Sequence, residues 1–329
     1  MSWKRLDVEF TLKSPLHIGY LPSKGSVISP TRYYVPGKNF WGAVTKRLTE
    51  HLCDNPRGKD YQTIGKEIEE NFRFTYFYIH DGKKAYMPEF KDGKGLVYGG
   101  QDNYDFENRF IGSRVMTALD KNGSGTAEDG SLHEIEFINN RYKDRKGNIN
   151  DTKLIGCIFI KNDGEIKHNY KENYSITSNK RGIFVDDFNI IEELTIGGEQ
   201  KYGFGIVELT GIGNIKYHVS FTFDNDETTF EVNENTPLFS HLEYSTNLPF
   251  KGDIELVSGR EYKDPRENGE NDKRYHHPGK KITKTKRYFA PGTIILEKIE
   301  VLMDYCGLLT LKKNIDSEST DPGDNGVES

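Results

Sequence analysis

The first clear pattern along the chain is an alternation of apolar and polar side chains over residues 5–13. Every second position from Leu6 to Leu12 is apolar, which predicts a strand with one buried face. A loop rich in glycine, proline and serine follows, and Pro36 then leads into apolar positions spaced four apart from Phe40 to Leu48. This spacing predicts a helix. The chain therefore opens with a strand, a loop and a helix.

Most later elements are predicted strands. Apolar-rich segments on either side of the polar stretch 120–131 predict a long hairpin over residues 109–138. Strands with few helices indicate an α+β class built on an antiparallel sheet, and the β-α-β opening favours a ferredoxin-like (RRM-like) topology. The other predicted strands span residues 72–79, 154–160, 206–212, 217–223, 254–257 and 293–301.

The length of 329 residues predicts two domains, because one domain usually takes roughly 100 to 200 residues. We expect a ferredoxin-like domain over residues 1–215 and a second β-rich domain over 216–313. Residues 264–286 read as a long loop within the second domain. Residues 314–329 are polar and acidic and predict a disordered tail.

The formal net charge of −6 is concentrated at the C-terminus. Five acidic residues and no basic ones follow Asn314, so the rest of the chain carries a net charge of only −1. A nucleic-acid partner is therefore not excluded. The densest basic cluster runs from Lys273 to Arg287 and includes His276 and His277; it reads either as a phosphate-facing loop or as a solvated one.

Cysteine usage and hydropathy limit the class of protein further. Cys53, Cys157 and Cys306 are far apart and form no CxxC pair, so neither a disulfide framework nor a zinc site is predicted, and we expect no cofactor. No apolar stretch reaches the roughly 18 to 20 residues of a membrane helix, and the N-terminus lacks a signal-peptide core. These features predict a cytoplasmic protein without membrane association.

A glycine-rich loop over residues 197–205 is the most distinctive chemical motif. Glycines can turn backbone N–H groups toward a phosphate at close range, while a lysine adds charge and an aromatic ring can stack on a base. Alternatively, the loop is a plain turn between strands whose aromatic residues are core residues beside a bulge. No Walker lysine or third glycine follows, so a nucleotide-hydrolysing enzyme is not expected. The residues concerned are Gly197, Gly198, Lys201, Tyr202, Gly203, Phe204 and Gly205.

Three segments in this order resemble the RAMP superfamily of CRISPR-associated proteins, specifically subunits of type III effector complexes. The first combines Ser14–Gly19 with Tyr34–Ala43 and is similar to the family's first strand and its Pro-Gly entry to the first helix. The second, Arg114 to Leu132, is similar to the family's protruding hairpin. The third is the glycine loop. Chain length, loop position and the C-terminal extension look most like the Cas family numbered five.

This resemblance implies a ferredoxin-like fold, a role in prokaryotic antiviral defence, and assembly with the backbone and large subunits of a type III complex. The family member would grip the 5′ repeat-derived handle of the CRISPR RNA and cap the backbone filament. The glycine loop would follow the RNA backbone, and the hairpin would reach the guide–target duplex and thus the target RNA; alternatively, the hairpin is a surface loop. Further RNA-binding candidates are Lys38, Trp41, Lys46 and Arg47 at the first helix and Arg109 and Arg114 at the hairpin.

The resembled superfamily also contains enzymes that cleave RNA, so the residues that such enzymes would need are sought in this sequence. Residues 14–39 contain no Asp or Glu, so the carboxylate that a metal-assisted cleavage of target RNA would use is missing. His17 and His51 could act in metal-independent cleavage through the RNA 2′-OH, although a lone histidine after a strand is usually structural. We therefore expect no catalytic residue and no metal. The alternatives are a guide-processing endoribonuclease and a protein–protein scaffold.

Overall fold

The computed structural model describes residues 2–20, 27–117, 132–168, 172–213, 221–223, 227–259 and 284–312. Several predictions lie outside the described residues. These are the hairpin tip, most of the basic cluster before Lys284, the first part of the predicted strand 217–223, and the acidic tail.

A seven-stranded sheet forms the centre of the molecule. Its longest strand, β1 (Trp3–Leu12), lies between β12 (Lys153–Lys161) and β18 (Ile206–Ile212), and both neighbours run antiparallel to it. The predicted strand over residues 72–79 is interrupted and forms two shorter ones. The other members are β3 (Tyr34–Val35), β4 (Phe72–Phe74), β5 (Phe77–His80) and β17 (Glu193–Thr195). The order is β17-β18-β1-β12-β5-β3, with β4 paired to β12.

Two helices follow β1 and cover one face of this sheet. The first, α1 (Gly37–Leu52), is the predicted helix, whereas α2 (Gly58–Asn71) was not predicted. The backbone N–H of Arg57 donates to the carboxylate of Asp60 at 2.7 Å, which satisfies a free donor at the start of α2. A third helix, α3 (Asn103–Phe110), precedes the hairpin. None of the helices in the described ranges is long and apolar enough to cross a membrane.

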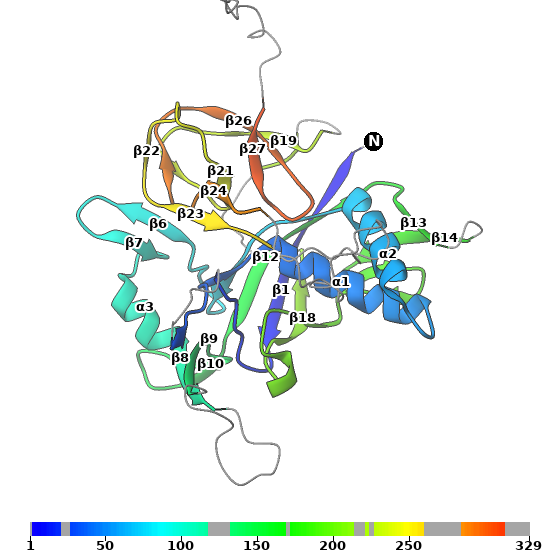
Figure 1. Ribbon diagram of the computed structural model, residues 1–329, viewed down its shortest axis with the longest axis horizontal. Coiled ribbons are helices and arrows are strands. Elements are labelled where there is room, and N and C mark those ends of the chain that lie inside the picture. The colour runs from blue at the N-terminus through cyan, green and yellow to red at the C-terminus, as the bar shows by residue number, and fades with distance from the viewer. Residues whose placement is uncertain are drawn as a thin grey trace, which may run out of the picture.

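Strand β12 shows how the layers are built, because it is buried on both faces. Leu154 and Ile158 pack in the core beneath α1 and α2. Ile155 and Phe159 point the other way, into a second core shared with the C-terminal strands. The helices, the central sheet and the C-terminal sheet thus form three successive layers, and Figure 1 shows the C-terminal strands gathered above β1 and β12.

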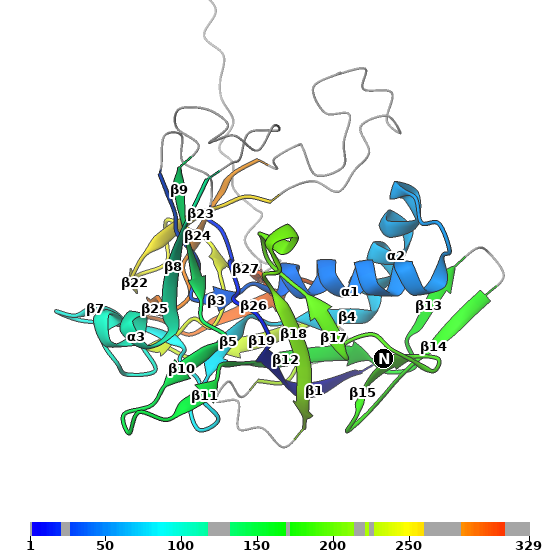
Figure 2. The same cartoon turned by 90° about the horizontal axis from the view of Figure 1, so that it is seen from below.

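The predicted hairpin is present within the described residues. It consists of β8 (Ile111–Met116) and β9 (His133–Ile138), which pair antiparallel, while β2 (Ile28–Ser29) joins β9 in parallel. Arg109 and Phe110 belong to α3 rather than to the hairpin. Figures 1 and 2 show the hairpin and α2 at opposite ends of the molecule.

The segment between β12 and β18 departs from a plain ferredoxin-like topology. That topology places a second helix there, but the chain forms a four-stranded sheet instead. Its strands are β13 (Glu165–His168), β14 (Glu172–Asn179), β15 (Gly182–Val185) and β16 (Phe188–Asn189). The α+β, strand-rich class is therefore confirmed, and the ferredoxin-like topology stays a prediction, with β13 to β16 standing where that topology has its second helix.

The C-terminal part forms a six-stranded sheet with the order β19-β26-β27-β21-β24-β23 and a smaller sheet, β20-β25-β22. The strands are β19 (Thr229–Val232), β20 (Thr236–Pro237), β21 (Leu242–Glu243), β22 (Phe250–Lys251), β23 (Ile254–Val257), β24 (Lys286–Phe289), β25 (Ile294–Ile295), β26 (Ile299–Met303) and β27 (Leu309–Leu311). Two short hairpins complete the fold, β6 (Pro88–Lys91) with β7 (Gly95–Tyr98) and β10 (Arg141–Lys143) with β11 (Ile149–Asp151). The predicted domain boundary after residue 215 lies outside the described residues.

Candidate nucleic-acid interface

A cavity of about 410 Å³ opens where α1, the glycine loop and the C-terminal sheet meet. Lys38 lines it from the first turn of α1, and Gly197 and Gly198 line it from the glycine loop. Tyr20 and Arg32 contribute from the segment between β1 and α1. We call this space the α1 cavity. The fold thus joins the start of the first helix and the glycine loop, two segments that the sequence singled out.

The glycine loop closes tightly on the chain that follows β1. Gly197 and Gly205 adopt left-handed backbone angles, with φ of +78° and +85°. A Cβ on either would collide with a backbone oxygen, that of His17 or that of Ile196. The N–H of Gly205 donates to the carbonyl of Pro15 at 2.8 Å. These glycines are therefore required for the close approach of two protein segments.

Part of the loop's backbone hydrogen-bonding capacity is used inside the protein. The N–H of Gly198 donates to the carbonyl of His17 at 2.9 Å, and that of Gly203 donates to the carbonyl of Gln200 at 3.0 Å. Together with the N–H of Gly205, these groups are not free for a phosphate. The prediction that the loop glycines aim their N–H groups at RNA is wrong at these three positions.

The side chains of the loop divide into two groups. Lys201 and Tyr202 lie on a short 3-10 helix, Gln200–Tyr202, and both are exposed, Tyr202 to 63%. Phe204 is only 2% exposed and packs edge-on against Phe137 of β9, with 5.4 Å between ring centres. Phe204 is therefore a core residue with no open face for a base, which corrects its assignment as an RNA contact.

A buried polar cluster forms the floor of the α1 cavity. Arg32 pairs with Glu255 and donates to the hydroxyl of Tyr34 at 3.0 Å. His241 Nε2 lies 2.8 Å from a Glu255 oxygen, and the Tyr76 hydroxyl lies 2.6 Å from His241 Nδ1. Burial lowers the pKa of His241 despite the opposing effect of Glu255. These contacts fit a neutral His241 ring. Its Nε2–H donates to Glu255, and its Nδ1 accepts a hydrogen bond from the Tyr76 hydroxyl.

The ionisation of this cluster determines the net charge at the floor of the cavity. Burial opposes ionisation of Glu255, but His241 and Arg32 outweigh it and lower the pKa of Glu255, so the carboxylate balances the guanidinium. Arg32 also stacks on Tyr20, 4.2 Å from the ring centre, and Tyr20 remains 43% exposed. Lys38 forms no salt bridge within the described part of the chain. A lysine, a tyrosine ring and the positive end of α1 therefore face the cavity.

Farther along α1, Trp41 is tied to its neighbours. Its Nε1 donates to the carbonyl of Gly65 in α2 at 3.1 Å, and its ring packs on Tyr305 at 5.3 Å between centres. Trp41 thus fastens α1 to α2 and to the C-terminal part. Lys46, one turn beyond, is exposed.

Arg47 and His51 lie near the end of α1 and contact the segment around β16. Arg47 donates to the carbonyl of Asn189 at 3.3 Å, pairs with Glu192 at 3.4 Å, and lies 5.0 Å from the ring centre of Phe188. The His51 ring stacks on the same Phe188 at 3.7 Å. The candidate phosphate contact Arg47 is therefore already occupied by protein partners.

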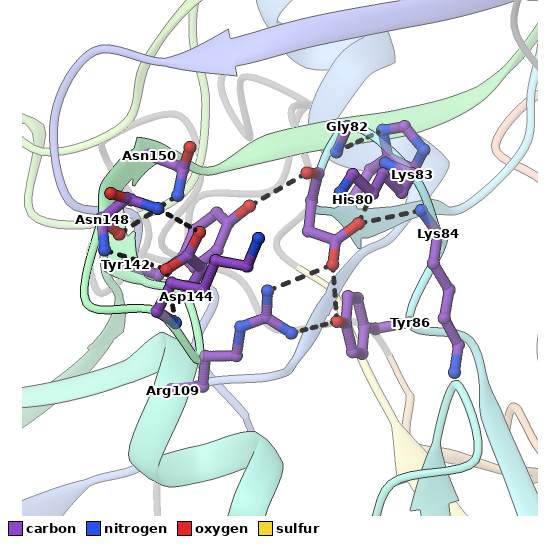
Figure 3. Close-up of polar contacts among 12 residues, drawn as sticks. His80, Gly82, Lys83, Lys84, Tyr86, Arg109, Tyr142, Asp144, Asn148 and Asn150 are labelled. Carbon is purple, nitrogen blue, oxygen red and sulfur yellow. Dashed lines mark hydrogen bonds and ion pairs between the residues drawn. The ribbon is translucent and has the colours of Figure 1, made fainter.

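Arg109 is the clearest departure from the predicted interface. It pairs with Asp81 at 3.1 Å, donates to the hydroxyl of Tyr86, and lies 4.6 Å from the ring centre of Tyr142. Burial opposes ionisation of Asp81, but hydrogen bonds from Tyr86 and from backbone N–H groups, together with Arg109, lower the pKa of the carboxyl. Figure 3 shows the Arg109 guanidinium directed toward Tyr86. Arg109 holds α3 in place and is not free to contact RNA.

Arg114 occupies a different environment although it is only five residues away. It lies on β8 opposite Ile135, and it is exposed. It remains available as a hairpin contact.

His17 is buried at 5% exposure beneath the glycine loop. Its Nδ1 lies 2.7 Å from the carbonyl oxygen of Glu136, which can only accept, so Nδ1 donates. The ring thereby joins the chain that follows β1 to β9. Within the described ranges, no group of three or more His, Cys, Asp or Glu side chains is arranged to hold a metal ion.

The residues that build the cavity floor were not predicted from the sequence. Arg32 and Tyr20 lie in a segment that reads as a loop, and Glu255 lies in a predicted strand with no polar partner nearby in the sequence. The pair of tyrosines that follows Arg32 was the only local signal. His241 has none, because its partners are far away along the chain.

Comparison with known proteins gives structural similarities only. No protein-family model and no curated protein matches the chain. A chain of the type III-B Cmr-beta complex bound to cognate target RNA and AMPPnP is similar with 12% identity and a TM-score of 0.49, over 89% of this chain and 86% of that one. A CRISPR protein from Archaeoglobus fulgidus gives 11% identity and a TM-score of 0.32, over 93% and 97%.

By name, these neighbours are a chain of a Cmr-beta complex and a CRISPR protein. Another Cmr-beta structure with target RNA gives a TM-score of 0.45 at 12% identity, over 94% of this chain and 99% of that one. Because these TM-scores are below 0.5, the similarities place no residue of this chain on RNA. The assignment to the Cas family numbered five stays a prediction.

Proposed function

We propose that this chain is a non-catalytic RNA-binding subunit of a type III CRISPR effector complex. It would grip the 5′ repeat-derived handle of the CRISPR RNA and cap the filament of backbone subunits. The observation that carries the proposal is the α1 cavity, where Lys38 and the positive end of α1 lie beside the exposed ring of Tyr20. A lysine neutralises a phosphate and a tyrosine stacks on a base, which is the combination that single-stranded RNA requires.

The glycine loop extends this surface through its side chains. Lys201 and Tyr202 are exposed on the loop whose first glycines line the cavity. Arg114 on the hairpin supplies a further cation toward a guide–target duplex. The strands β18, β1, β12 and β5 would form a ferredoxin-like core together with α1 and α2. In this core, β13 to β16 would stand in place of the second helix.

Binding without cleavage fits the positions of the two candidate histidines. His17 is buried and donates to a backbone carbonyl, and His51 is stacked on Phe188 at the other end of α1. Neither histidine is among the residues that line the α1 cavity. Residues 14–39 also contain no carboxylate.

The test measures binding of the full chain to an RNA that carries the repeat handle, over a range of salt concentrations. Lys38→Ala and Lys201→Ala should each weaken binding and reduce the slope of log K against log salt by about one, because one phosphate contact is lost. Lys180→Ala is the matched control, since Lys180 is exposed in the turn between β14 and β15. Equal slopes for all three variants would contradict the proposed contact surface.

Two further measurements separate the alternatives. Incubation with repeat RNA in EDTA should leave the RNA intact, whereas discrete cleavage that is lost in His17→Ala or His51→Ala would favour an endoribonuclease. Effector complexes prepared without this chain should fail to retain the handle. Normal assembly in its absence would overturn the proposal.

A further inference from the structure

A second groove, of about 590 Å³, shares Tyr20 with the α1 cavity as a lining residue. Its walls carry three tyrosines, two carboxylates and one lysine. We call it the tyrosine groove. Those residues are Tyr20, Tyr33, Tyr98, Glu107, Glu136 and Lys94.

The groove and the cavity are continuous at one short segment of chain. Tyr20 lines both spaces. Thr31 lines the groove and Arg32, the next residue, lines the cavity. Gly19 and Thr31 are paired by a β-bridge, which holds this segment in position. A nucleotide whose phosphate enters the cavity beside Lys38 can therefore place its base on the groove side of Tyr20.

Two carboxylates supply hydrogen-bond acceptors to the groove. Glu107 Oε1 accepts from the Tyr33 hydroxyl and from Asn103 Nδ2, each at 2.6 Å. Glu136 Oε2 accepts from the backbone N–H of Thr31 at 3.1 Å. Within the described residues, Glu107 Oε2 and Glu136 Oε1 accept no hydrogen bond. Each carboxylate is thus fixed through one oxygen and offers the other to a ligand.

This chemistry repels phosphate and selects among bases. A carboxylate accepts hydrogen bonds, so it suits a base edge that presents N–H groups. Guanine carries a ring N1–H and an exocyclic N2 amino group side by side, and Lys94 can donate to its O6. Uracil presents one N–H between two carbonyl oxygens, which the carboxylates disfavour. Tyr20, which is 43% exposed, supplies ring surface for either base, whereas Tyr98 is only 7% exposed and stacks on Phe106.

We propose that the tyrosine groove is a guanine-selective base pocket in which Glu107 or Glu136 accepts hydrogen bonds from the N1–H and N2 amino group. The proposal rests on the RNA-binding function proposed above. It adds a sequence preference at one nucleotide to a contact that is otherwise made with the RNA backbone.

The experiment compares four RNAs of eight nucleotides on the purified full chain. One is all uridine, and the others carry a single central guanosine, inosine or adenosine. A bidentate contact to a base discriminates by roughly 1–3 kcal/mol, so the guanosine RNA should bind about tenfold more tightly than the uridine RNA. Inosine keeps N1–H and lacks the N2 amino group, so its affinity should fall to near that of uridine.

Glu107→Gln and Glu136→Gln test the carboxylates without removing their internal contacts, because the amide oxygen can still accept from Tyr33 and Asn103 or from Thr31. One of the two variants should lose the guanosine preference and keep its affinity for the uridine RNA. The matched control is Glu134→Gln on the same strand, β9, which should retain the preference.

The outcomes separate this inference from the proposed function. If the uridine RNA does not bind, the proposed function fails. If the uridine RNA binds and guanosine, inosine and adenosine give equal affinities, or if both glutamine variants keep the preference, the guanine pocket is overturned while RNA binding stands.

Discussion

The two ends of α1 carry similar cations in opposite situations. At the N-terminal end, Lys38 borders a cavity and forms no salt bridge within the described residues. Near the C-terminal end, Arg47 is held by Asn189, Glu192 and Phe188. Charge at a helix therefore does not identify an RNA contact. The segment that packs against each turn decides whether the cation is available.

The difference has a physical origin in the two surroundings. The last turns of a helix favour a positive charge, and the segment around β16 adds a carbonyl and a carboxylate that hold Arg47 in place. At the first turn, backbone rather than side chain approaches α1. Phe74 and Cys306 bring their carbonyl oxygens against Gly37. Lys38, the next residue, lines the cavity.

The largest expected effect concerns this close approach. Gly37→Ala should destabilise the protein by about 3 kcal/mol, because a Cβ would collide with two carbonyl oxygens that cannot move easily. Gly42→Ala in the same helix is the control. No atom lies within 4 Å of a Cβ there, so alanine should stabilise the helix by about 1 kcal/mol. Urea unfolding measures both. Equal effects at the two glycines would show that the N-terminal end is not tightly packed.

The second prediction contrasts the two cations in RNA binding. Lys38→Ala should reduce affinity for handle RNA about tenfold and lower the salt slope by about one. Arg47→Ala should leave the slope unchanged, since its guanidinium is already paired. Fluorescence anisotropy at several salt concentrations distinguishes them. A lower slope in Arg47→Ala would place RNA along the whole helix.

The third prediction reverses the comparison by measuring stability. Arg47→Ala should cost about 1 kcal/mol, because it removes a hydrogen bond and a cation–π contact at a half-buried position. Lys38→Ala should change stability by less than about 0.5 kcal/mol. Thermal unfolding of both variants provides the test, and a larger loss for Lys38→Ala would contradict a free side chain.

The smallest expected effect concerns how the free energy of unfolding depends on pH. It involves His241, which lines the cavity at the N-terminal end of α1. Burial lowers the pKa of His241 below its ordinary value of 6.5. The unfolded chain then takes up a proton more readily than the folded one, so the stability from neutral His241 is present above pH 6.5 and is lost as the pH falls below it. His241→Gln should flatten this dependence between pH 7 and pH 5. The free energy of unfolding is measured with urea at each pH. If it changes with pH as much in His241→Gln as in the unchanged protein, the prediction is contradicted.

Local sequence patterns predicted the elements whose periodicity is strong. The alternation around Val8, the fourfold spacing from Phe40 and the apolar run of β18 all form the expected strands and helix. Helix α2 was missed because its apolar face is sparse, with Ile64 and Ile68 among mostly polar residues. The strand predicted over residues 72–79 is interrupted at Thr75, whose N–H donates to the carbonyl of Cys157.

The sequence by itself determined the order of the main strands, the first helix, the hairpin and the place of the glycine loop, because these depend on periodicity and on glycine. Tertiary structure alone decided which candidates can meet a ligand. Phe204 and Arg109 are enclosed, whereas Lys38 and Tyr202 are not. It also joined Arg32 to Glu255 and His241. Partners so far apart in sequence leave no local pattern, since their contact depends on how the two sheets pack.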